Sequence, residues 1–430
     1  MFRQVNKLAT LNRLPTCSQN LYFYRNYSTG CGKVSGIFNF EEKSVSPSST
    51  LPDLNINNIN INNSNSLNNT INDNKKNILS LSKDDLIKEC QELHMTPFNA
   101  NQIWNWVYNK NKMSIDSFSN ISLEKRNALK EKFYIDFGTI SKDSLSVDGT
   151  RKFLLEFKGG DKVECVFIPE ANRGTLCVSS QVGCTFSCSF CHTGTQKLVR
   201  NLTSDEIVAQ VLATRMILGD TQPNKKRLLT HIVFMGQGEP LYNYRNVSKA
   251  IQKLTDGNGI SLGKSKITLS TSGVVPLIDK LSKDHPGVGL AISLHASNDK
   301  TRDELVPCNK QWNIEELMNS CIQYSKTNRD RITIEYVMLK DVNDSIEDAY
   351  KLAQLIKPFP SFVNLIPFNQ WPGTKYVCSS NNAIHRFSDV LQKQGIKVTI
   401  RQPRGRDILA ACGTLKSDSV KKPKTVPPPL

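Results

Sequence analysis

The sequence contains no apolar run that reaches the roughly 18 residues needed to cross a membrane. We therefore expect a soluble protein with no membrane partner. A secretory signal peptide is missing as well, so the twelve cysteines do not indicate a secreted scaffold held by disulfides. Three of the cysteines instead lie at a spacing typical of metal clusters, which favours a reducing compartment.

Acidic residues are absent from the first 40 positions, and the first one is Glu41. The same stretch carries basic residues at Arg3, Lys7, Arg13, Arg25 and Lys33. This composition is typical of a mitochondrial transit peptide, and the sequence Arg25-Asn-Tyr-Ser resembles a presequence cleavage site. We expect residues 1–40 to direct the protein to the mitochondrial matrix. The alternative is a disordered basic tail on a cytoplasmic protein.

Over the whole chain, 55 Lys and Arg residues outnumber 39 Asp and Glu residues, which gives a net charge of +16. Such an excess attracts polyanions, because each basic side chain that neutralises a phosphate releases counterions. Residues 41–77 have a different composition, and eleven of the twenty residues from 55 to 74 are asparagine. A tract this polar buries too little apolar surface to fold, so we expect a disordered linker there.

Apolar periodicity divides the rest of the chain into four parts. Residues 78–140 carry apolar stripes at helical spacing and predict a small helical, accessory RNA-binding domain. Residues 141–175 predict a β-hairpin connector that turns at Asp148-Gly149. Residues 176–415 predict the α/β core, and residues 416–430 form a basic, Pro-rich tail.

In the core, six predicted strands alternate with five predicted helices. The strands are 176–180, 231–235, 266–271, 288–295, 331–339 and 362–367, and the helices are 204–218, 244–254, 275–282, 314–325 and 345–356. Helices that join successive strands of one sheet make the strands parallel and bring functional residues to their carboxyl ends. Six units rather than eight predict a partial (β/α)6 barrel, whose open side could admit a large substrate.

Three thiols follow the first of these strands, in Cys184-Thr-Phe-Ser-Cys188-Ser-Phe-Cys191. The short gaps allow the segment to curl, so that the sulfurs converge on one centre. Three thiolates are one fewer than a closed 4Fe-4S or tetrahedral zinc site needs, and only His192 is near enough in sequence to be a fourth ligand. The pattern favours an iron-sulfur cluster with one iron open to a small molecule. A zinc knuckle or a disulfide pair is the alternative.

Polar residues and glycines follow the later strands at the same predicted edge. After the second strand, the glycines of Met235-Gly-Gln-Gly-Glu-Pro allow a close backbone approach, and Glu239 can accept a hydrogen bond from an ammonium group. One such residue alone would be an ordinary turn or core group, but their recurrence at strand ends indicates a binding site. The residues concerned are Gly238, Glu239, Ser270, Ser272, Ser293, Leu294, His295 and Asn369.

Together these motifs resemble the RlmN/Cfr-type radical S-adenosylmethionine (SAM) RNA methyltransferases, specifically the RlmN branch, which methylates carbon 2 of adenine. The resemblance covers roughly residues 78–415. It is carried by the segments 175–184, 188–191, 200–202, 235–241, 292–296, 364–369 and 404–413. In the radical SAM superfamily the methionine part of SAM chelates the iron that has no protein thiolate, which agrees with a set of three cysteines.

The resemblance implies a role for each matching residue. The implied ligands of a 4Fe-4S cluster are Cys184, Cys188 and Cys191; the implied SAM contacts are Gly238, Glu239, Ser270, Ser293, Leu294, His295 and Asn369; and the implied catalytic residues are Cys412, Cys177 and Glu164. In this reading Cys412 carries the methyl group, Cys177 is its partner thiol and Glu164 is the proton acceptor.

The chemistry of adenine explains why two additional thiols are needed. Carbon 2 has no nucleophilic lone pair, whereas a thiolate is nucleophilic, so Cys412 can take a methyl group from one SAM molecule. In the family, a radical formed from a second SAM activates this methyl group, and a covalent protein-RNA adduct follows. Cys177 then releases the product by forming a disulfide with Cys412. The resemblance therefore implies two SAM molecules per turnover.

The resemblance also implies the partners. Family members act on an adenine of large-subunit ribosomal RNA and on an adenosine next to the anticodon of transfer RNA, and such a base must be unstacked to react. We expect a flavodoxin- or ferredoxin-type electron donor and a monomeric enzyme. The alternatives are methylation of carbon 8, as in the Cfr branch, and a non-enzymatic iron-sulfur protein that binds RNA.

A fusion of residues 1–27 to a fluorescent reporter is expected to localise to mitochondria, because this leader is basic and has no acidic residue. Microscopy with a mitochondrial dye measures the result. In the matched control the leader's basic residues Arg3, Lys7, Arg13 and Arg25 are changed to Gln, and the reporter should then stay diffuse. A diffuse cytosolic signal from the unchanged leader would contradict the prediction.

Overall fold

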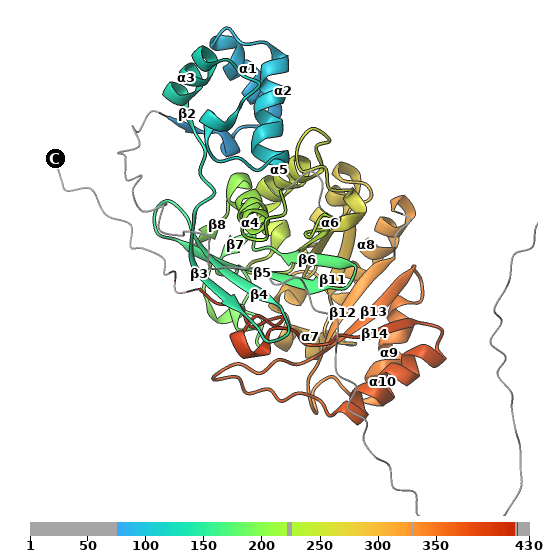
Figure 1. The fold of residues 1–430 in the computed structure, drawn as a ribbon. Coiled ribbons are helices and arrows are strands. Elements are labelled where there is room, and N and C mark those ends of the chain that lie inside the picture. The colour runs from blue at the N-terminus through green and yellow to red at the C-terminus, as the bar shows by residue number, and fades with distance from the viewer. Residues whose placement is uncertain (1–74, 222–225, 329–330, 418, 420–430) are drawn as a thin grey trace, which may run out of the picture. The chain divides into compact units, whose positions relative to one another are not determined.

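The computed structural model describes residues 75–221, 226–328, 331–417 and 419 of the 430-residue chain (Figure 1). The predicted transit peptide lies outside these residues, as do most of the predicted linker and tail. β1 (Lys76–Asn77), which pairs in parallel with β2 (Phe133–Tyr134), lies just before the boundary predicted at residue 78. No helix within the described ranges is long and apolar enough to span a membrane.

Helices form in the predicted helical part of the chain, and each of its three α-helices begins at a capping side chain. Ser82, Thr96 and Ser122 accept hydrogen bonds from backbone N–H groups in the first turn of the helix that follows each of them. Trp104 and Trp106 are buried, as expected for core residues. The helices are η3 (Ile78–Ser80), α1 (Lys83–Glu92), α2 (Pro97–Trp104), η4 (Asn105–Asn109), η5 (Ile115–Ser117) and α3 (Leu123–Lys132).

Buried hydrogen bonds join the helical domain to the α/β core. The guanidinium of Arg215, on α4 (Ser204–Ile217), donates to the carbonyl oxygen of Tyr108 at 2.8 Å. The ammonium of Lys253, on α5 (Tyr244–Thr255), donates to the carbonyl oxygen of Leu79. Because these donors are buried, the two parts that the sequence predicts as separate domains share a polar as well as an apolar interface.

One ten-stranded sheet organises the core, in the order β14-β13-β12-β11-β10-β9-β6-β5-β4-β3. The strands from β14 to β6 are parallel to their neighbours, whereas β5, β4 and β3 continue the sheet in antiparallel pairing. The strands are β3 (Thr139–Leu145), β4 (Arg151–Glu156), β5 (Lys162–Glu170), β6 (Arg173–Cys177), β9 (His231–Phe234), β10 (Ile267–Thr271), β11 (Gly289–Ser293), β12 (Ile332–Met338), β13 (Ser361–Pro367) and β14 (Lys397–Ile400).

Helices cover the parallel part of the sheet, which explains why strands such as β12 are apolar along most of their length (Figure 1). Besides α4 and α5 these helices are α6 (Val275–Asp284), α7 (Asp299–Leu305), α8 (Ile314–Thr327), α9 (Ile346–Ile356) and α10 (Asn381–Lys393). Since β14 and β3 are the two edges, the sheet is not closed. The predicted partial barrel is therefore confirmed.

Every predicted strand and helix of the core has a counterpart, and the structure adds β14, α7 and α10. β14 has only four residues, of which none is fully buried, so it lacks the apolar run that identifies the other parallel strands. The hairpin predicted over residues 141–175 is not a separate connector, because β5 pairs with β6 and the hairpin extends the same sheet. The domain boundary predicted at residue 175 therefore falls within a strand.

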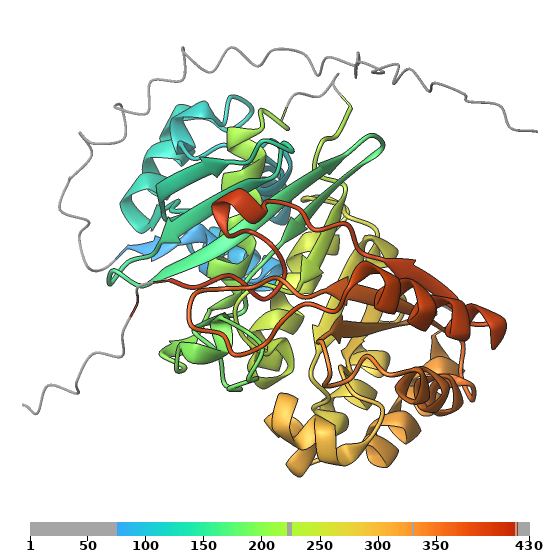
Figure 2. The ribbon, with the colours of Figure 1, turned by 90° about the horizontal axis from the view of Figure 1, so that it is seen from below.

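The chain after β14 returns across the sheet to the hairpin of β3 and β4 (Figure 2), and we call residues 401–417 the return segment. Its Asp407 accepts a hydrogen bond from the Ser146 hydroxyl at 2.6 Å, and its Gly405 N–H donates to Asp148 at 2.9 Å. Gly405 has a φ of 63°, a conformation that favours glycine. The hairpin thus fixes the segment that carries Cys412.

A fully buried arginine ties together the carboxyl ends of two central strands. Arg302 of α7 donates hydrogen bonds to backbone carbonyl oxygens at the carboxyl ends of β10 and β11. It also donates to a side-chain amide oxygen. The acceptors are the carbonyl oxygens of Ser272, Ser293 and Leu294 and Oδ1 of Asn309. A buried guanidinium is tolerated only when its donors are paired in this way.

The substitution Arg302→Met is expected to lower the free energy of unfolding by about 3 kcal/mol, because it leaves several buried carbonyl groups without donors. Chemical denaturation followed by circular dichroism measures the change. The matched control is Arg386→Met, on the exposed face of α10, which should change stability by less than about 0.5 kcal/mol. Equal stability of the two variants would show that the Arg302 contacts contribute nothing.

Candidate active site

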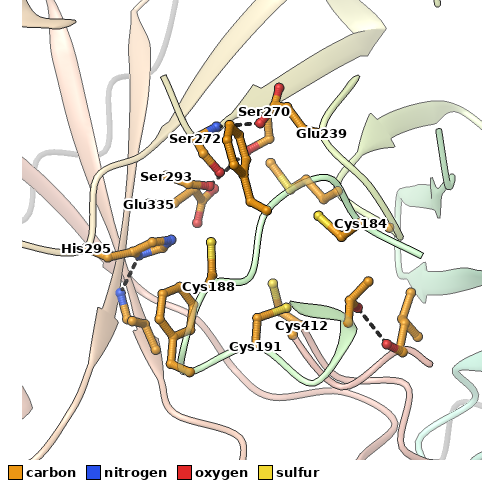
Figure 3. Close-up of a pocket in the computed structure, with 18 of the residues that line it drawn as sticks. Cys184, Cys188, Cys191, Glu239, Ser270, Ser272, Ser293, His295, Glu335 and Cys412 are labelled. Carbon is orange, nitrogen blue, oxygen red and sulfur yellow. Dashed lines mark hydrogen bonds between the residues drawn. The ribbon is translucent and has the colours of Figure 1, made fainter. Parts of the chain in front are cut away.

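A cavity of about 150 Å³ lies at the carboxyl ends of the parallel strands, where the sequence predicts the binding residues. Residues that follow β9, β10, β11 and β13 line it, together with the loop that carries the three clustered cysteines (Figure 3). The predicted site residues that line the cavity are Cys184, Cys188, Cys191, Gly238, Glu239, Ser270, Ser293, His295, Asn369 and Cys412. The fold thus brings both ends of the core sequence to one place.

The clustered cysteines lie on a tight loop closed at its base by a small ribbon of β7 (Gln181–Val182) and β8 (Arg200–Asn201). Close backbone approach shapes this loop. A Cβ atom at Gly194 would lie 2.7 Å from the carbonyl oxygen of Cys188, so only glycine fits there. The close approach of the Cys188 carbonyl group therefore explains why a glycine occupies position 194.

His192, which the sequence left as a possible fourth ligand, turns away from the cavity. Its ring stacks on that of Trp371, with centroids 4.9 Å apart and an interplanar angle of 8°. Its backbone N–H donates to the carbonyl oxygen of Gly413 at 2.8 Å. Burial lowers the pKa of His192, which favours a neutral ring. His192 therefore holds the return segment against the cysteine loop.

The three clustered thiols fit the expected cluster in their placement and burial. Their side chains face the same cavity (Figure 3), and none of the cysteines in the described ranges is in a disulfide. Burial raises the pKa of Cys184 to about 12, and it also raises the pKa of Cys188 and Cys191. A bound cationic cluster would offset this cost, because metal binding deprotonates thiols. Within the described residues, no three His, Cys, Asp or Glu side chains surround a single metal-ion position.

Glu239 follows β9 and is almost completely buried in the cavity wall. Its carboxylate accepts hydrogen bonds from the backbone N–H groups of Leu241 at 3.0 Å and Ser272 at 2.8 Å. Burial nevertheless raises the pKa of Glu239 to about 7. Gly238 precedes it with a φ of 97°, and a Cβ atom there would lie 2.4 Å from the Cβ atom of Gln181. The glycine is what lets this carboxylate reach the cavity.

The ends of β10 and β11 supply neutral polar groups to the same wall. The hydroxyls of Ser270 and Ser293 lie 3.4 Å apart. Nδ1 of His295 accepts a hydrogen bond from the Val337 N–H at 3.1 Å, and burial lowers the pKa of His295 to about 3, so the ring is neutral with its proton on Nε2. Leu294, also a predicted contact, does not line the cavity, because its side chain is buried in the core.

The two additional thiols are neighbours, but only one of them lines the cavity. Cys412, on the return segment, lines the cavity beside Cys191 (Figure 3). Cys177, at the end of β6, packs in the apolar cluster of Val166 and Leu415 and does not line the cavity. Burial raises the pKa of Cys177 to about 12, and the neighbouring thiol of Cys412 adds to this shift. Both cysteines are free.

Glu164, the predicted proton acceptor, lies on β5 and not in the cavity wall. Its Oε1 forms an ion pair with the Lys152 ammonium at 2.7 Å, and its Oε2 accepts a hydrogen bond from the backbone N–H of Lys416 at 2.8 Å. Glu164 thus anchors the end of the return segment.

Sequence reasoning missed two charged residues near the cavity. Glu335 lines it from β12 and accepts a hydrogen bond from the Asn364 amide at 2.8 Å. Arg401, directly after β14, lines a smaller neighbouring cavity together with Cys412. Glu335 could have been noticed as the one charged residue in the apolar segment Ile332–Met338. Arg401 gave no such signal, since β14 itself was not predicted.

Comparison with known proteins agrees with this geometry. The model of the radical SAM superfamily matches residues 178–353, and the model of the ribosomal RNA large subunit methyltransferase N-terminal domain matches residues 76–135. The dual-specificity RNA methyltransferase RlmN of Rhodopseudomonas palustris strain HaA2 is 49% identical over 362 residues, which cover 81% of this chain and 90% of the relative. RlmN of Rhizobium meliloti is 49% identical over 370 residues with the same coverage.

The chain belongs to the RlmN family of radical SAM RNA methyltransferases. A crystal structure of a radical SAM methyltransferase from Sphaerobacter thermophilus has the same fold, with a TM-score of 0.75 and 38% identity, and the match covers 79% of this chain and 98% of that one. The RlmN family uses a 4Fe-4S cluster and SAM. These cofactors agree with the three buried thiols and with the carboxylate and hydroxyls that share their cavity.

Proposed function

We propose that this RlmN-family enzyme methylates carbon 2 of adenine in ribosomal or transfer RNA, with Cys412 as the methyl carrier and Cys177 as the resolving thiol. One observation carries the proposal. Two thiols that are 235 positions apart in sequence, at residues 177 and 412, are close neighbours, and one of them faces the cavity that holds the three clustered cysteines.

When bound, the cluster and SAM supply the methyl group and the radical chemistry that adenine carbon 2 requires. The protein supplies two sulfurs at different depths. Cys412 lines the cavity and could carry the methyl group to the base, whereas Cys177 does not line it and packs against the cluster of Val166 and Leu415, near Cys412. This difference in position supports Cys412 as the methyl carrier and Cys177 as the resolving thiol.

Release of the product requires one exchange step. The thiolate of Cys177 attacks the sulfur of Cys412, a disulfide forms, and the carbon-sulfur bond to the RNA breaks. The electron pair of that bond goes to the carbon, which takes a proton to become the methyl group. A flavodoxin- or ferredoxin-type donor then returns two electrons to the disulfide. For Glu164 to accept the proton of carbon 2, its carboxylate would have to turn from Lys152 and Lys416 toward the cavity, since it does not line the cavity.

For SAM we propose the cavity wall opposite the return segment. Glu239 would accept a hydrogen bond from the ammonium group, and the hydroxyls of Ser270 and Ser293 and the neutral ring of His295 would contact the rest of the molecule. Asn369, whose amide donates to the Cys412 carbonyl oxygen at 3.3 Å, would link the SAM site to the methyl carrier. The basic, acid-free leader supports an enzyme that works in mitochondria, and we propose that it acts as a monomer.

SAM affinity is expected to fall as the pH is lowered from about 8 to about 6. Burial raises the pKa of Glu239 to about 7, so its carboxyl is charged above that pH and neutral below it, and only the charged form attracts an ammonium strongly. Glu239→Gln should bind SAM about tenfold more weakly or worse and lose this part of the pH dependence. Calorimetric titration of the reconstituted enzyme measures both effects.

The matched control for this measurement is Glu304→Gln, which changes an exposed carboxylate of α7. It should keep the affinity and the pH profile of the unchanged enzyme. An unchanged profile in Glu239→Gln would show that this carboxylate does not bind the ammonium group.

Replacing Cys412 and replacing Cys177 should block the reaction at different steps. Cys412→Ala has no sulfur on which to carry carbon and should give neither methylated RNA nor adduct. Cys177→Ala should form the adduct and then stall, because the carbon-sulfur bond breaks only when another sulfur attacks. The adduct is measured as a shifted protein band that nuclease shrinks and reducing agent does not. An adduct in Cys412→Ala would reverse the assignment.

The control variant is Cys378→Ala, which removes a partly buried thiol outside the cavity and should stay active. Mass spectrometry of the RNA product from the unchanged enzyme should identify 2-methyladenosine. Methylation at carbon 8 would assign the enzyme to the Cfr reaction, and an RNA that is bound but not methylated would favour the non-enzymatic alternative.

A further inference from the structure

A row of polar side chains crosses the parallel sheet and ends at the main cavity. It starts at the edge strand, where the hydroxyl of Thr399 on β14 donates to Oδ1 of Asn364 on β13 at 3.0 Å. The amide nitrogen of Asn364 then donates to Oε2 of Glu335 on β12 at 2.8 Å. The side chains meet in this way because the three residues are register partners on adjacent strands. The row therefore connects an exposed threonine to a buried carboxylate.

These hydrogen bonds fix how the groups of the row are oriented. Since Oδ1 of Asn364 accepts from a hydroxyl, Nδ2 is the amide atom that donates to Glu335. That donor occupies Oε2, and within the described part of the chain no group donates a hydrogen bond to Oε1. Glu335 is only 5% exposed and lines the cavity. The cavity wall thus contains a buried acceptor, Oε1, that still needs a donor.

The neighbours of Glu335 on this wall are the serines proposed to contact SAM. Ser293 of β11 is its register partner, and the Ser293 hydroxyl lies 3.4 Å from that of Ser270 on β10. Figure 3 shows Glu335 beside Ser293, with Cys412 on the other side of the cavity. In the sheet, β10 and β11 lie between β9, which precedes Glu239, and β12, which carries Glu335. A ligand anchored at Glu239 by its ammonium group would extend along this wall toward Glu335.

We propose that Glu335 binds the ribose of SAM by accepting hydrogen bonds from its 2′- and 3′-hydroxyls, and that Asn364 orients the carboxylate for this contact. The inference rests on the SAM site proposed above. Each carboxylate oxygen can accept two hydrogen bonds, so Oε1 alone can serve both hydroxyls of the diol. The ribose lies between the methionine part and the adenine of SAM, which agrees with a place beyond the two serines.

The diol would also offset the cost of burying this carboxylate. Burial raises the pKa of Glu335, whereas the amide of Asn364 lowers it. Two further hydroxyl donors act in the same direction as that amide, because hydrogen bonds to a carboxylate favour its charged form. Glu335 is therefore a group that SAM can satisfy and that the protein alone satisfies only in part.

The target adenine offers a different donor, since its 6-amino group could reach Oε1 instead. The position of Glu335 favours SAM. The base must bind beside the methyl carrier Cys412, which lies across the cavity from Glu335, whereas Ser293 is its direct neighbour. The two readings differ in which ligand loses affinity when the carboxylate is changed.

The two fragments of SAM, 5′-deoxyadenosine and methionine, allow a test without RNA. Calorimetric titration of the cluster-loaded enzyme, with methionine present, measures the affinity for 5′-deoxyadenosine and for its analogues that lack the 2′- or the 3′-hydroxyl. In the unchanged enzyme the loss of either hydroxyl should weaken binding about tenfold, because it removes a hydrogen bond to a carboxylate.

The variant Glu335→Gln should bind 5′-deoxyadenosine about tenfold more weakly, and the loss of a hydroxyl should then change the affinity by less than about threefold. The reason is that Asn364 still donates to the one amide oxygen, so the ligand meets a donor in place of an acceptor. If Glu335→Gln does not fold, Glu335→Met removes the acceptor and carries the same expectation.

Methionine alone is the control ligand. Its affinity should be the same in Glu335→Gln as in the unchanged enzyme, because its ammonium group binds at Glu239. The matched control variant is Glu315→Gln, which changes an exposed carboxylate in the first turn of α8 and should leave every affinity unchanged. An equal loss of methionine affinity in Glu335→Gln would overturn the assignment of Glu335 to the ribose.

Asn364 should act only through Glu335. Asn364→Leu removes the donor to Oε2 and should weaken 5′-deoxyadenosine binding about threefold. The same change made in Glu335→Met should have no further effect, because no carboxylate is left to orient. A further loss of the same size in that double variant would overturn the orienting role, since it would show that Asn364 acts on the fold.

A tenfold dependence on the hydroxyls that persists in Glu335→Gln would overturn the proposal. If that variant also fails to bind the target RNA, the reading with the adenine amino group would replace it. This result would leave the SAM site and the methylation reaction untouched. An unchanged enzyme that binds neither SAM nor its fragments would instead refute the proposed function, so the two failures can be told apart.

Discussion

The polar contacts of the return segment are the constraint on which the site depends. Cys412 comes from the chain after the edge strand β14, so it reaches the cysteine loop only because the segment is held across the sheet. The segment has no strand pairing of its own, and its backbone groups must therefore find other partners. They find them in the β3–β4 hairpin, the cysteine loop and β5, through Gly405 to Asp148, Gly413 to His192, Leu415 to Thr193, Lys416 to Glu164 and Ser417 to Gln196.

Buried glutamines connect these parts into one unit. Gln237, after β9, donates to Oε1 of Gln196 on the cysteine loop at 3.1 Å and accepts from the backbone N–H of Glu164 on β5 at 2.9 Å. Gln196 in turn donates to Ser417 of the return segment at 3.0 Å. Because an unpaired amide is costly in the interior, a shift of one part would leave partners unsatisfied in the others. The cysteine loop, β5 and the return segment are thereby fixed relative to one another.

The alternation of apolar strand segments with helical segments along the chain was enough to predict the parallel strands and their helices. It also predicted the edge of the sheet at which the cavity lies. Residues at strand ends were predictable for the same reason, since the carboxyl ends of parallel strands share one edge. Leu294 shows the limit of the same rule, because a strand-end motif does not reveal which of its side chains lines the cavity. β14 and Arg401 could not be predicted, because their placement depends on pairing with β13 and on long-range contacts of the return segment.

Burial disfavours the charged forms of the thiol, carboxyl and imidazole groups that line the cavity. The change in the pKa of Cys184 from 9.0 to about 12 makes its thiolate about 4 kcal/mol less favourable than in water. Burial likewise keeps His295 neutral and brings Glu239 near its point of half-ionisation at neutral pH. A site of this kind stays nearly neutral until cationic ligands enter, and their charge then favours ionisation of the thiols and the carboxyl together. Binding of the cofactors and activation of the residues are therefore coupled by the low dielectric of the same cavity.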